Sequence, residues 1–328
     1  MAKKPRTKQQ VVKEYAAAFP ASGNLTLAKH IYKENPNLFP TIEAARSAVR
    51  HVRGNHGKRS RDNALPELMK KNGKAGEYKI PKSLVPKKRV VRIPDGKTLL
   101  LSDIHLPFHD VEAVECALNH CKDPTNIILN GDTVDFYATS RWESDPNHRD
   151  LAGELQASRQ FLMHLRERFP KANIYFKIGN HEERWEKFLW RKAPELCGVP
   201  DFKMEKLLRF EDLDIQEIGG RQLTKAGGLW ILHGHEFFNT FDPVNFARTL
   251  QVKTGVSTIA GHKHKTSQHS VKSMDGETIA CWSVGCLCDL EPDYMPVNQW
   301  NLGFAEITHK GKKFEVNNYR IIDGEAYR

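Results

Sequence analysis

The stretch LLLSDIHLPFHD, residues 99 to 110, places two metal-binding side chains directly after an apolar run. Residues 99–101 are typical of a buried strand, and Asp103 and His105 follow where that strand should end. In an open α/β sheet, functional side chains gather beyond the carboxyl ends of the parallel strands. We therefore expect Asp103 and His105 to form one edge of a shared site.

Four more short apolar segments end in the same way. Each runs into Asp, Asn or His beside a glycine. The segments are NIILNGD (126–132), NIYFKIGN (173–180), LWILHGH (229–235) and STIAGH (257–262). Helical patterns intervene at residues 110–121, 150–169 and 181–192. Five such ends in one chain predict an α/β fold in which the polar residues converge on one crevice.

The residue types at these ends favour a metal site. Carboxylates, neutral imidazoles and an amide oxygen suit borderline divalent ions such as Mn, Fe, Zn, Ni or Co, whereas an all-oxygen set would suggest Mg or Ca. The set also holds too many ligands for one ion. Each of the motifs DxH, GD and GNH occurs by chance in many sequences. Their occurrence together in this order is strong evidence for a metal site.

The motifs DIH (103–105), GDTVD (131–135), GNHE (179–182), His233 and GHKH (261–264) resemble, in order, those of the calcineurin-like metallophosphoesterase superfamily. The resemblance extends over residues 97–308, and SDIHLPFHD and GNHEERW are similar to stretches of enzymes encoded by tailed bacteriophages. It implies a four-layer α/β/β/α sandwich with two divalent metal ions. Manganese is the first expectation for these ions.

The resemblance also implies a set of ligands for each ion. The first ion would be held by Asp103, His105 and His264, and the second by Asn180, His233 and His262. Asp132 would bridge the two ions. Two ions about 3.5 to 4 Å apart clamp a phosphoryl group and activate a bridging water as the nucleophile.

The same resemblance gives His181 a catalytic role. It follows the ligand Asn180, so it would lie over the phosphate and protonate the leaving oxygen as the general acid. Asp135 would orient the imidazole of His181, and its alternative is a helix N-cap or strand-end role. Glu182 is expected to hydrogen-bond a ligand.

Two sequence differences from a related group of enzymes narrow the expected class of substrate. Protein serine/threonine phosphatases of the superfamily usually carry an arginine after the second Asp of GDxxD and another directly before GNHE, where this chain has Phe136 and Ile178. A protein phosphatase is therefore not expected. Nearby basic residues that would replace these arginines are Arg141, Arg184 and Lys263. Aromatic residues that would line a base-stacking groove, or pack in the core, are Phe136, Tyr137, Trp142, Trp185 and Trp190.

The positive charge is concentrated at the start of the chain. Residues 1–61 hold 13 Lys and Arg against 3 Asp and Glu, a net charge of +10 that equals the formal charge of all 328 residues. Helical patterns at residues 9–19, 25–34 and 42–53 suit a small helix-turn-helix-like domain that contacts nucleic acid. The candidate contacts are Arg46, Arg50, Arg53, Lys58, Arg59 and Arg61. A helical oligomerisation domain is the alternative.

The remaining composition suggests a linker and a cellular compartment. Residues 62–95 turn to Lys, Gly and Pro and are expected to be a linker to a catalytic domain at residues 96–328. We see no secretory signal and no stretch of membrane-spanning length, so we expect no membrane contact and a cytoplasmic protein, in the host cytoplasm if the gene is a phage gene. Cys286 and Cys288 are interpreted as buried thiols, with metal binding as the alternative.

These features favour a metal-dependent phosphodiesterase that acts on nucleic acid, with residues 1–61 as a tether. The first alternative is a small-molecule phosphatase or cyclic-nucleotide phosphodiesterase, because loop shape decides the substrate. The second is a non-enzymatic DNA-binding or regulatory protein on the same fold. The complete ligand set argues against this second alternative.

Overall fold

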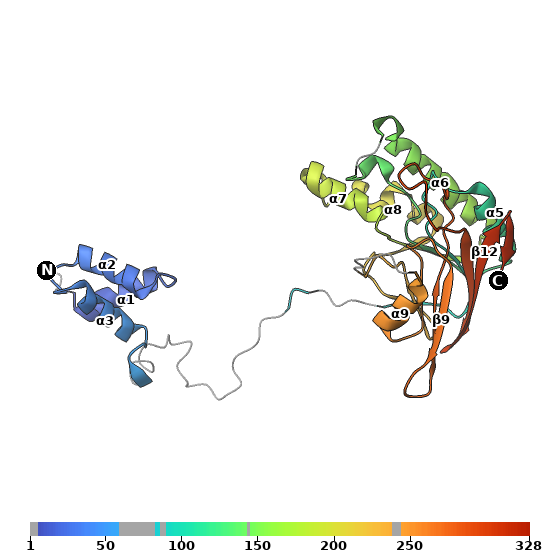
Figure 1. Cartoon of the computed structure of the whole chain (residues 1–328). Helices are drawn as coiled ribbons and strands as arrows, with labels where there is room; N and C mark the ends of the chain where they lie inside the picture. Colours follow the sequence, from blue (N-terminus) through green and yellow to red (C-terminus); the bar gives the residue numbers. More distant parts are fainter. Residues whose placement is uncertain (1–5, 59–82, 86–89, 143–144, 238–243) are drawn as a thin grey trace. The chain divides into compact units, whose positions relative to one another are not determined.

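The chain forms two compact units, Met1–Pro86 and Lys87–Arg328 (Figure 1). The structure is a computed structural model, and it describes residues 6–58, 83–85, 90–142, 145–237 and 244–328.

The first unit contains the three helices that the sequence predicts. They are α1 (Lys8–Ala18), α2 (Asn24–Glu34) and α3 (Ile42–Val52). The side chains of Thr7 and Thr41 accept hydrogen bonds from backbone N–H groups of the first turns of α1 and α3, so each threonine caps its helix. The apolar faces of the helices share a core made of Val11, Val12, Leu27, Ala28, Ile31, Phe39, Ala45 and Val49.

The second unit is built on two sheets. The larger sheet has seven strands in the order β13-β12-β11-β2-β3-β4-β5. Its strands are β13 (Glu325–Tyr327), β12 (Lys313–Ile322), β11 (Gly303–Lys310), β2 (Gly96–Leu101), β3 (Asn126–Asn130), β4 (Asn173–Lys177) and β5 (Ile215–Ile218). From β2 to β5 neighbouring strands are parallel, so their carboxyl ends lie at one edge.

The smaller sheet has six strands in the order β1-β6-β7-β8-β10-β9. Its strands are β1 (Val91–Ile93), β6 (Thr224–Ala226), β7 (Leu229–Leu232), β8 (Thr258–Ala260), β10 (Thr278–Ser283) and β9 (Ser267–Lys272). β7 and β8 are parallel neighbours, as β2 and β3 are in the larger sheet.

Helices cover the outer face of each sheet, which gives four layers. Figure 1 shows α5 (Val111–His120), α6 (Leu151–Arg168) and α7 (Glu182–Lys192) on one side of the sheets, and α9 (Phe246–Thr254) on the other. A short helix, α8 (Met204–Leu207), follows α7. The prediction of a four-layer α/β/β/α sandwich is confirmed.

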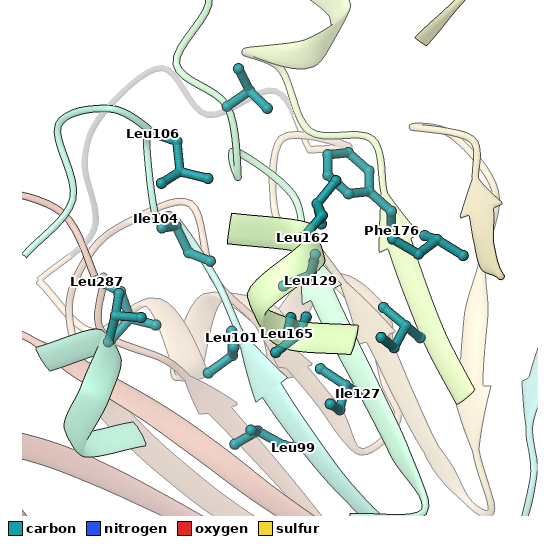
Figure 2. Packing of buried hydrophobic residues seen from close by; sticks show 14 of the residues in the cluster. Leu99, Leu101, Ile104, Leu106, Ile127, Leu129, Leu162, Leu165, Phe176 and Leu287 are labelled. Carbon is teal, nitrogen blue, oxygen red and sulfur yellow. The ribbon is translucent and has the colours of Figure 1, made fainter. Parts of the chain in front are cut away.

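Side-chain alternation along the strands explains the layering. Leu99 and Leu101 of β2 pack with residues of α6 such as Leu165 (Figure 2), whereas Leu100 packs between the two sheets with Ile231 of β7. Successive side chains of a strand point to opposite faces, and here both faces are apolar. A continuous apolar run such as LLL is therefore what a strand in the middle of a sandwich requires.

The linker prediction needs a correction at its upper end. Residues 62–82 and 86–89 lie outside the described residues, but Val91–Ile93 form β1, which pairs in parallel with β6. Three strand residues are too few to show periodicity, so the sequence pattern missed them. None of the helices in the described ranges has both the length and the apolar composition that a membrane crossing requires.

Candidate metal centre

The structure brings all seven sequence-predicted ligands together at the carboxyl ends of five strands. Those strands belong to both sheets: β2, β3 and β4 to the larger one, and β7 and β8 to the smaller one. The ligands that follow them are Asp103 and His105, Asp132, Asn180, His233, and His262 and His264. The shared site that the sequence predicted at one sheet edge therefore lies where the edges of two packed sheets meet.

Asp103, His105 and His264 form the first group of donors. Nε2 of His264 lies 3.2 Å from Oδ1 of Asp103 and 3.3 Å from Nε2 of His105. Oδ2 of Asp103 is occupied, because it accepts hydrogen bonds from the hydroxyl of Ser102 and the backbone N–H of His262. Oδ1 of Asp103 is buried and has no hydrogen bond to any described residue. Two imidazole nitrogens thus converge beside a buried carboxylate oxygen that has no hydrogen bond, and these three donor atoms fit a metal ion.

Asp132, Asn180, His233 and His262 form the second group. Nε2 of His233 lies 3.2 Å from Oδ2 of Asp132 and 3.2 Å from Oδ1 of Asn180. Donor atoms of Asp132, His233 and His262 all lie within 4.8 Å of one another, as do those of Asp103, His105 and Asp132. Asp132 belongs to both sets of donors, which is the position that a bridging carboxylate requires.

The electrostatics of the centre also favour a cation. Burial opposes protonation of His233 and His264, but the carboxylates of Asp132 and Asp103 outweigh it and raise the pKa of each imidazole to about 10. Burial and the neighbouring His233 lower the pKa of His262 to about 3. The two buried carboxylates therefore demand positive charge, and metal ions would supply it in place of protons.

The backbone at the centre is strained. Asp103, His105, Asp132, His262 and His264 all have φ between 51° and 68°, the left-handed region. Non-glycine residues in sparsely populated regions cost on the order of 1 kcal/mol or more each and persist only where the surrounding structure holds them. Five such residues among seven predicted ligands indicate that the fold is shaped around this centre.

Glycines in the motifs are needed for close approach. A Cβ on Gly179 would overlap Oδ1 of Asp132, and a Cβ on Gly131 would lie 2.5 Å from Nδ1 of His233. Gly131 also has a φ of 91°. Gly179 therefore allows its loop to pack against Asp132, and Gly131 allows its loop to pack against His233.

Glu182 joins two ligand-bearing loops. Its Oε1 accepts the N–H groups of Thr133 and Val134, and its Oε2 accepts those of Asp132 and Gly179, at 2.7 to 3.0 Å. Burial and the charge of Asp132 raise the pKa of Glu182 to about 7, against the lowering effect of these N–H groups. The sequence suggested a hydrogen bond to a ligand, and Glu182 makes one with the backbone N–H of the predicted ligand Asp132.

A buried ion pair supports the loop of His233, and sequence reasoning missed it. Nζ of Lys177 lies 3.1 Å from Oε1 of Glu236, whose two oxygens accept the N–H groups of His233 and Gly234. Burial opposes ionisation of Glu236, but the Lys177 ammonium outweighs it and lowers the pKa of Glu236 to about 2. Because Lys177 and Glu236 belong to distant segments of the chain, no local pattern indicated this contact.

His181, Asp135 and Arg184 form a hydrogen-bonded group beside the donors. Nδ1 of His181 lies 2.9 Å from the carbonyl oxygen of Asp135 and 3.2 Å from its Oδ2, and Nε2 lies 3.8 Å from Oδ2 of Asp132. The guanidinium of Arg184 donates to Nε2 of His181 at 2.8 Å and lies 3.2 Å from Oδ1 of Asp135. A guanidinium and an imidazole therefore stand together next to the carboxylate of Asp132.

Asp135 has a second partner that the sequence did not suggest. Its Oδ2 lies 2.9 Å from Nδ1 of His105, so it fixes the ring whose other nitrogen faces the donors. Burial opposes ionisation of Asp135, but hydrogen bonds with His105 and His181 hold the pKa of its carboxyl well below the usual value. Asp135 contacts both imidazoles through the same oxygen.

Two cysteines and two aromatic residues near the centre are packed inside. Cys286 and Cys288 are buried free thiols, as expected, and Sγ of Cys288 lies 3.9 Å from Nδ1 of His264. Phe136 is fully buried, and Trp185 is buried with its indole N–H donated to the carbonyl of Phe202. These two rings therefore pack in the core, which is one of the two roles that the sequence allowed.

Trp142 and Trp190 are exposed, and Tyr137 is half-buried. The guanidinium of Arg141 lies 4.7 Å from the ring centre of Trp142.

The basic candidates of the first unit differ in their surroundings. Arg53 donates to the carbonyls of Phe19 and Ser22 and to Oδ1 of Asn24, so it holds the α1–α2 connection to α3. This occupation of its donors revises the expectation that Arg53 contacts phosphates. Arg46 and Arg50 are half-buried on α3, Lys58 is exposed, and Arg59 and Arg61 lie outside the described residues.

The fold and the donor set define a metal-dependent phosphoesterase. The chain belongs to the calcineurin-like phosphoesterase family, whose sequence profile matches residues 96–280. This confirms the resemblance that the motifs indicated. No curated protein matches the chain.

The chain is also similar to several solved structures. Vps29 from Entamoeba histolytica, complexed with Zn²⁺, is 13% identical, and the match covers 70% of this chain and 96% of that one with a TM-score of 0.38. Vps29 from Cryptosporidium parvum is 13% identical over 71% and 94% of the chains, with a TM-score of 0.38. A predicted phosphoesterase from Streptococcus pneumoniae is 14% identical over 72% and 97%, with a TM-score of 0.32.

Proposed function

We propose that the protein hydrolyses phosphodiester bonds in nucleic acid with the help of two divalent metal ions, manganese first among them. The observation that carries this proposal is the convergence of seven donor side chains from two sheets, with Asp132 in both sets. Asp103, His105 and His264 would hold one ion, and Asn180, His233 and His262 the other. When bound, the ions would neutralise phosphoryl oxygens and lower the pKa of water.

The chain's own residues would handle the leaving group. His181 lies next to Asp132 with its Nδ1 fixed by Asp135, which leaves Nε2 to face the centre. In the structure Nε2 accepts from Arg184, so it would give a proton to the leaving oxygen only once it is protonated and Arg184 has turned to the phosphate. Arg184 is held against the same nitrogen by Asp135. We assign to Arg184 the phosphate contact that protein phosphatases make with arginines at the positions of Phe136 and Ile178, because its guanidinium stands at the centre and both of those residues are apolar.

The first unit would tether the enzyme to its substrate. Arg46, Arg50 and Lys58 remain as candidate phosphate contacts among the described residues, and Arg59 and Arg61 continue the basic run in sequence. A tether of this kind acts through charge, so it raises the local concentration of nucleic acid without reading its sequence. The six unpaired thiols suit a reducing compartment such as the cytoplasm.

The activity itself is tested with small esters and DNA. The full-length protein with manganese should hydrolyse bis(4-nitrophenyl) phosphate and single- or double-stranded DNA, and should lose both activities when the metal is chelated. Metal-dependent hydrolysis of 4-nitrophenyl phosphate alone would favour the small-molecule phosphatase instead. Hydrolysis of cyclic nucleotides with no cleavage of DNA would favour the cyclic-nucleotide phosphodiesterase.

Deleting residues 1–61 should weaken DNA binding and leave hydrolysis of bis(4-nitrophenyl) phosphate nearly unchanged, because the second unit has its own core and carries the whole donor set. The slope of log affinity against log salt concentration should flatten by about 0.9 for each phosphate of duplex DNA that the protein no longer neutralises. A salt titration of binding measures this slope for both proteins.

Point variants sharpen the same test. Arg46→Gln with Arg50→Gln should flatten the slope in the full-length chain, whereas Lys310→Gln with Lys312→Gln, two exposed residues of the second unit, should not. An unchanged slope after the deletion would end the tether proposal. Light scattering would identify residues 1–61 as an oligomerisation domain if the deletion lowered the number of chains per particle and left the slope unchanged.

A further inference from the structure

Two aromatic rings extend outward from the candidate metal centre on the segment 289–300, which lies within the connection between β10 and β11. The ring of Trp300 lies 4.2 Å from that of His264, centroid to centroid, at an interplanar angle of 65°. The ring of Tyr294 lies 6.3 Å from that of Trp300 at 61°. Tyr294 is 67% exposed and Trp300 is half-buried. The rings therefore lead from a predicted ligand to the solvent.

Hydrogen bonds fix this segment at both ends and within. The N–H of Asp289 donates to the carbonyl of Phe108, and the N–H of Asn301 donates to the carbonyl of His264, each at 2.9 Å. The side chain of Asn298 donates to the carbonyls of Leu290 and Met295 and accepts the N–H of Trp300. The backbone on either side of Trp300 is thus fixed, and the residue that follows it is hydrogen-bonded to the predicted ligand His264.

Charged groups on the opposite side of the centre also act on the phenol of Tyr294. Partial desolvation and the negative charge of Asp135 raise the pKa of the Tyr294 phenol, and the positive charge of Arg184 lowers it. Asp135 ends the GDTVD segment and Arg184 lies on α7 just after GNHE, whereas Trp300 contacts the GHKH segment. The Tyr294 side chain therefore lies within electrostatic reach of the group that would bind the phosphate and protonate the leaving oxygen.

An exposed ring at this place suits a particular ligand. The phosphate of a substrate would be held at the metal centre and by Arg184, so the group esterified to it would extend toward the rings. Aromatic side chains stack on any nucleobase, and each such contact contributes about 1 to 3 kcal/mol to binding of single-stranded nucleic acid. An ester that carries only an aliphatic group has no planar face to stack.

We propose that Tyr294 and Trp300 form a stacking subsite for the nucleobase next to the phosphate held at the metal centre. The subsite rests on the proposed phosphodiesterase function for its substrate, and it assigns the recognition of the base to the segment 289–300. Base identity is not read there, because stacking is tolerant of sequence.

Equilibrium binding tests the subsite without turnover. The probes are thymidine 5′-monophosphate and methyl phosphate, which share a phosphate and differ in the base and sugar. With the full-length protein and manganese, Tyr294→Ala should weaken binding of thymidine 5′-monophosphate about tenfold and leave methyl phosphate unchanged. Tyr294→Phe keeps the ring and should bind both like the unchanged protein. Tyr327→Ala, at an exposed tyrosine of β13, is the matched control.

Cleavage of matched oligomers provides the second readout. Single-stranded oligothymidine and an oligomer of abasic tetrahydrofuran units have the same backbone charge, and only the first carries bases. Tyr294→Ala should lower kcat/KM about tenfold for oligothymidine, mainly through KM, and should leave the abasic oligomer unchanged. A tenfold effect on thymidine 5′-monophosphate alone would assign the subsite to nucleotide esters and not to the polymer.

Two results would overturn the subsite. Equal losses with and without a base would show that Tyr294 supports the loop and does not stack, and no loss with either probe would show that it contacts no base. If the unchanged protein cleaves no DNA, the proposed nuclease function fails, and the comparison of thymidine 5′-monophosphate with methyl phosphate still decides the subsite.

Discussion

Replacing Asp132 with alanine should remove both metal ions and lower phosphodiester hydrolysis by about a thousandfold or more, the scale of losing several kcal/mol of transition-state stabilisation. Oδ2 of Asp132 lies 3.2 Å from Nε2 of His233, and Asp132 also shares a donor group with Asp103 and His105. Each ion would therefore lose a carboxylate oxygen. Elemental analysis of the purified variant, with the unchanged protein as reference, measures the ions that remain.

A matched control separates metal loss from misfolding. Asp212→Ala removes an exposed carboxylate far from the predicted ligands in sequence, so its metal content and activity should equal those of the unchanged protein. Circular dichroism should show that the Asp132→Ala protein keeps its helices and strands. Two ions retained by Asp132→Ala would contradict the bridging role.

Replacing His181 with alanine should leave the ions in place and lower turnover by about a hundredfold, the usual scale for loss of a general acid. The imidazole is not among the seven predicted ligands, and its Nδ1 is held by Asp135 rather than directed at the donors. Steady-state kinetics on a series of aryl phosphodiesters measures the effect. The loss should shrink as the leaving group improves, because a nitrophenolate needs little protonation.

The leaving-group dependence is the decisive part of this second experiment. An equal loss for good and poor leaving groups would show that His181 positions the phosphate instead of donating a proton. Arg184→Lys offers a comparison, since it should weaken substrate binding and leave the leaving-group dependence intact. Loss of metal from the His181→Ala protein would instead assign the imidazole to the ligand set.

The sequence predicted the five strands that precede the ligands, and their ends, because both follow from local patterns. A strand buried on both faces reads as a continuous apolar run, and the ligand motifs begin where each run stops, as LLLSDIH shows with β2 ending at Leu101. The starts of two helices also follow from local signals, since Asp110 and Asp150 cap α5 and α6 at the predicted positions. The sequence pattern therefore indicated where each donor lies along the chain.

Contacts between distant segments were not predictable in the same way. Glu182 hydrogen-bonds the backbone of residues 132–134, and Lys177 pairs with Glu236, and neither partner leaves a mark on local periodicity. Arg53 has the charge of a phosphate contact, but the carbonyls at the end of α1 take its donors once the helices pack. Such assignments depend on which loops the fold brings together.

The number of metal ions bound to the unchanged full-length protein tests the central claim most directly. Crystals grown with manganese and measured for anomalous scattering would locate each ion. We expect two peaks per chain, one beside Asp103, His105 and His264, the other beside Asn180, His233 and His262, with the carboxylate of Asp132 between them. A single peak, or peaks away from these residues, would contradict the two-metal centre.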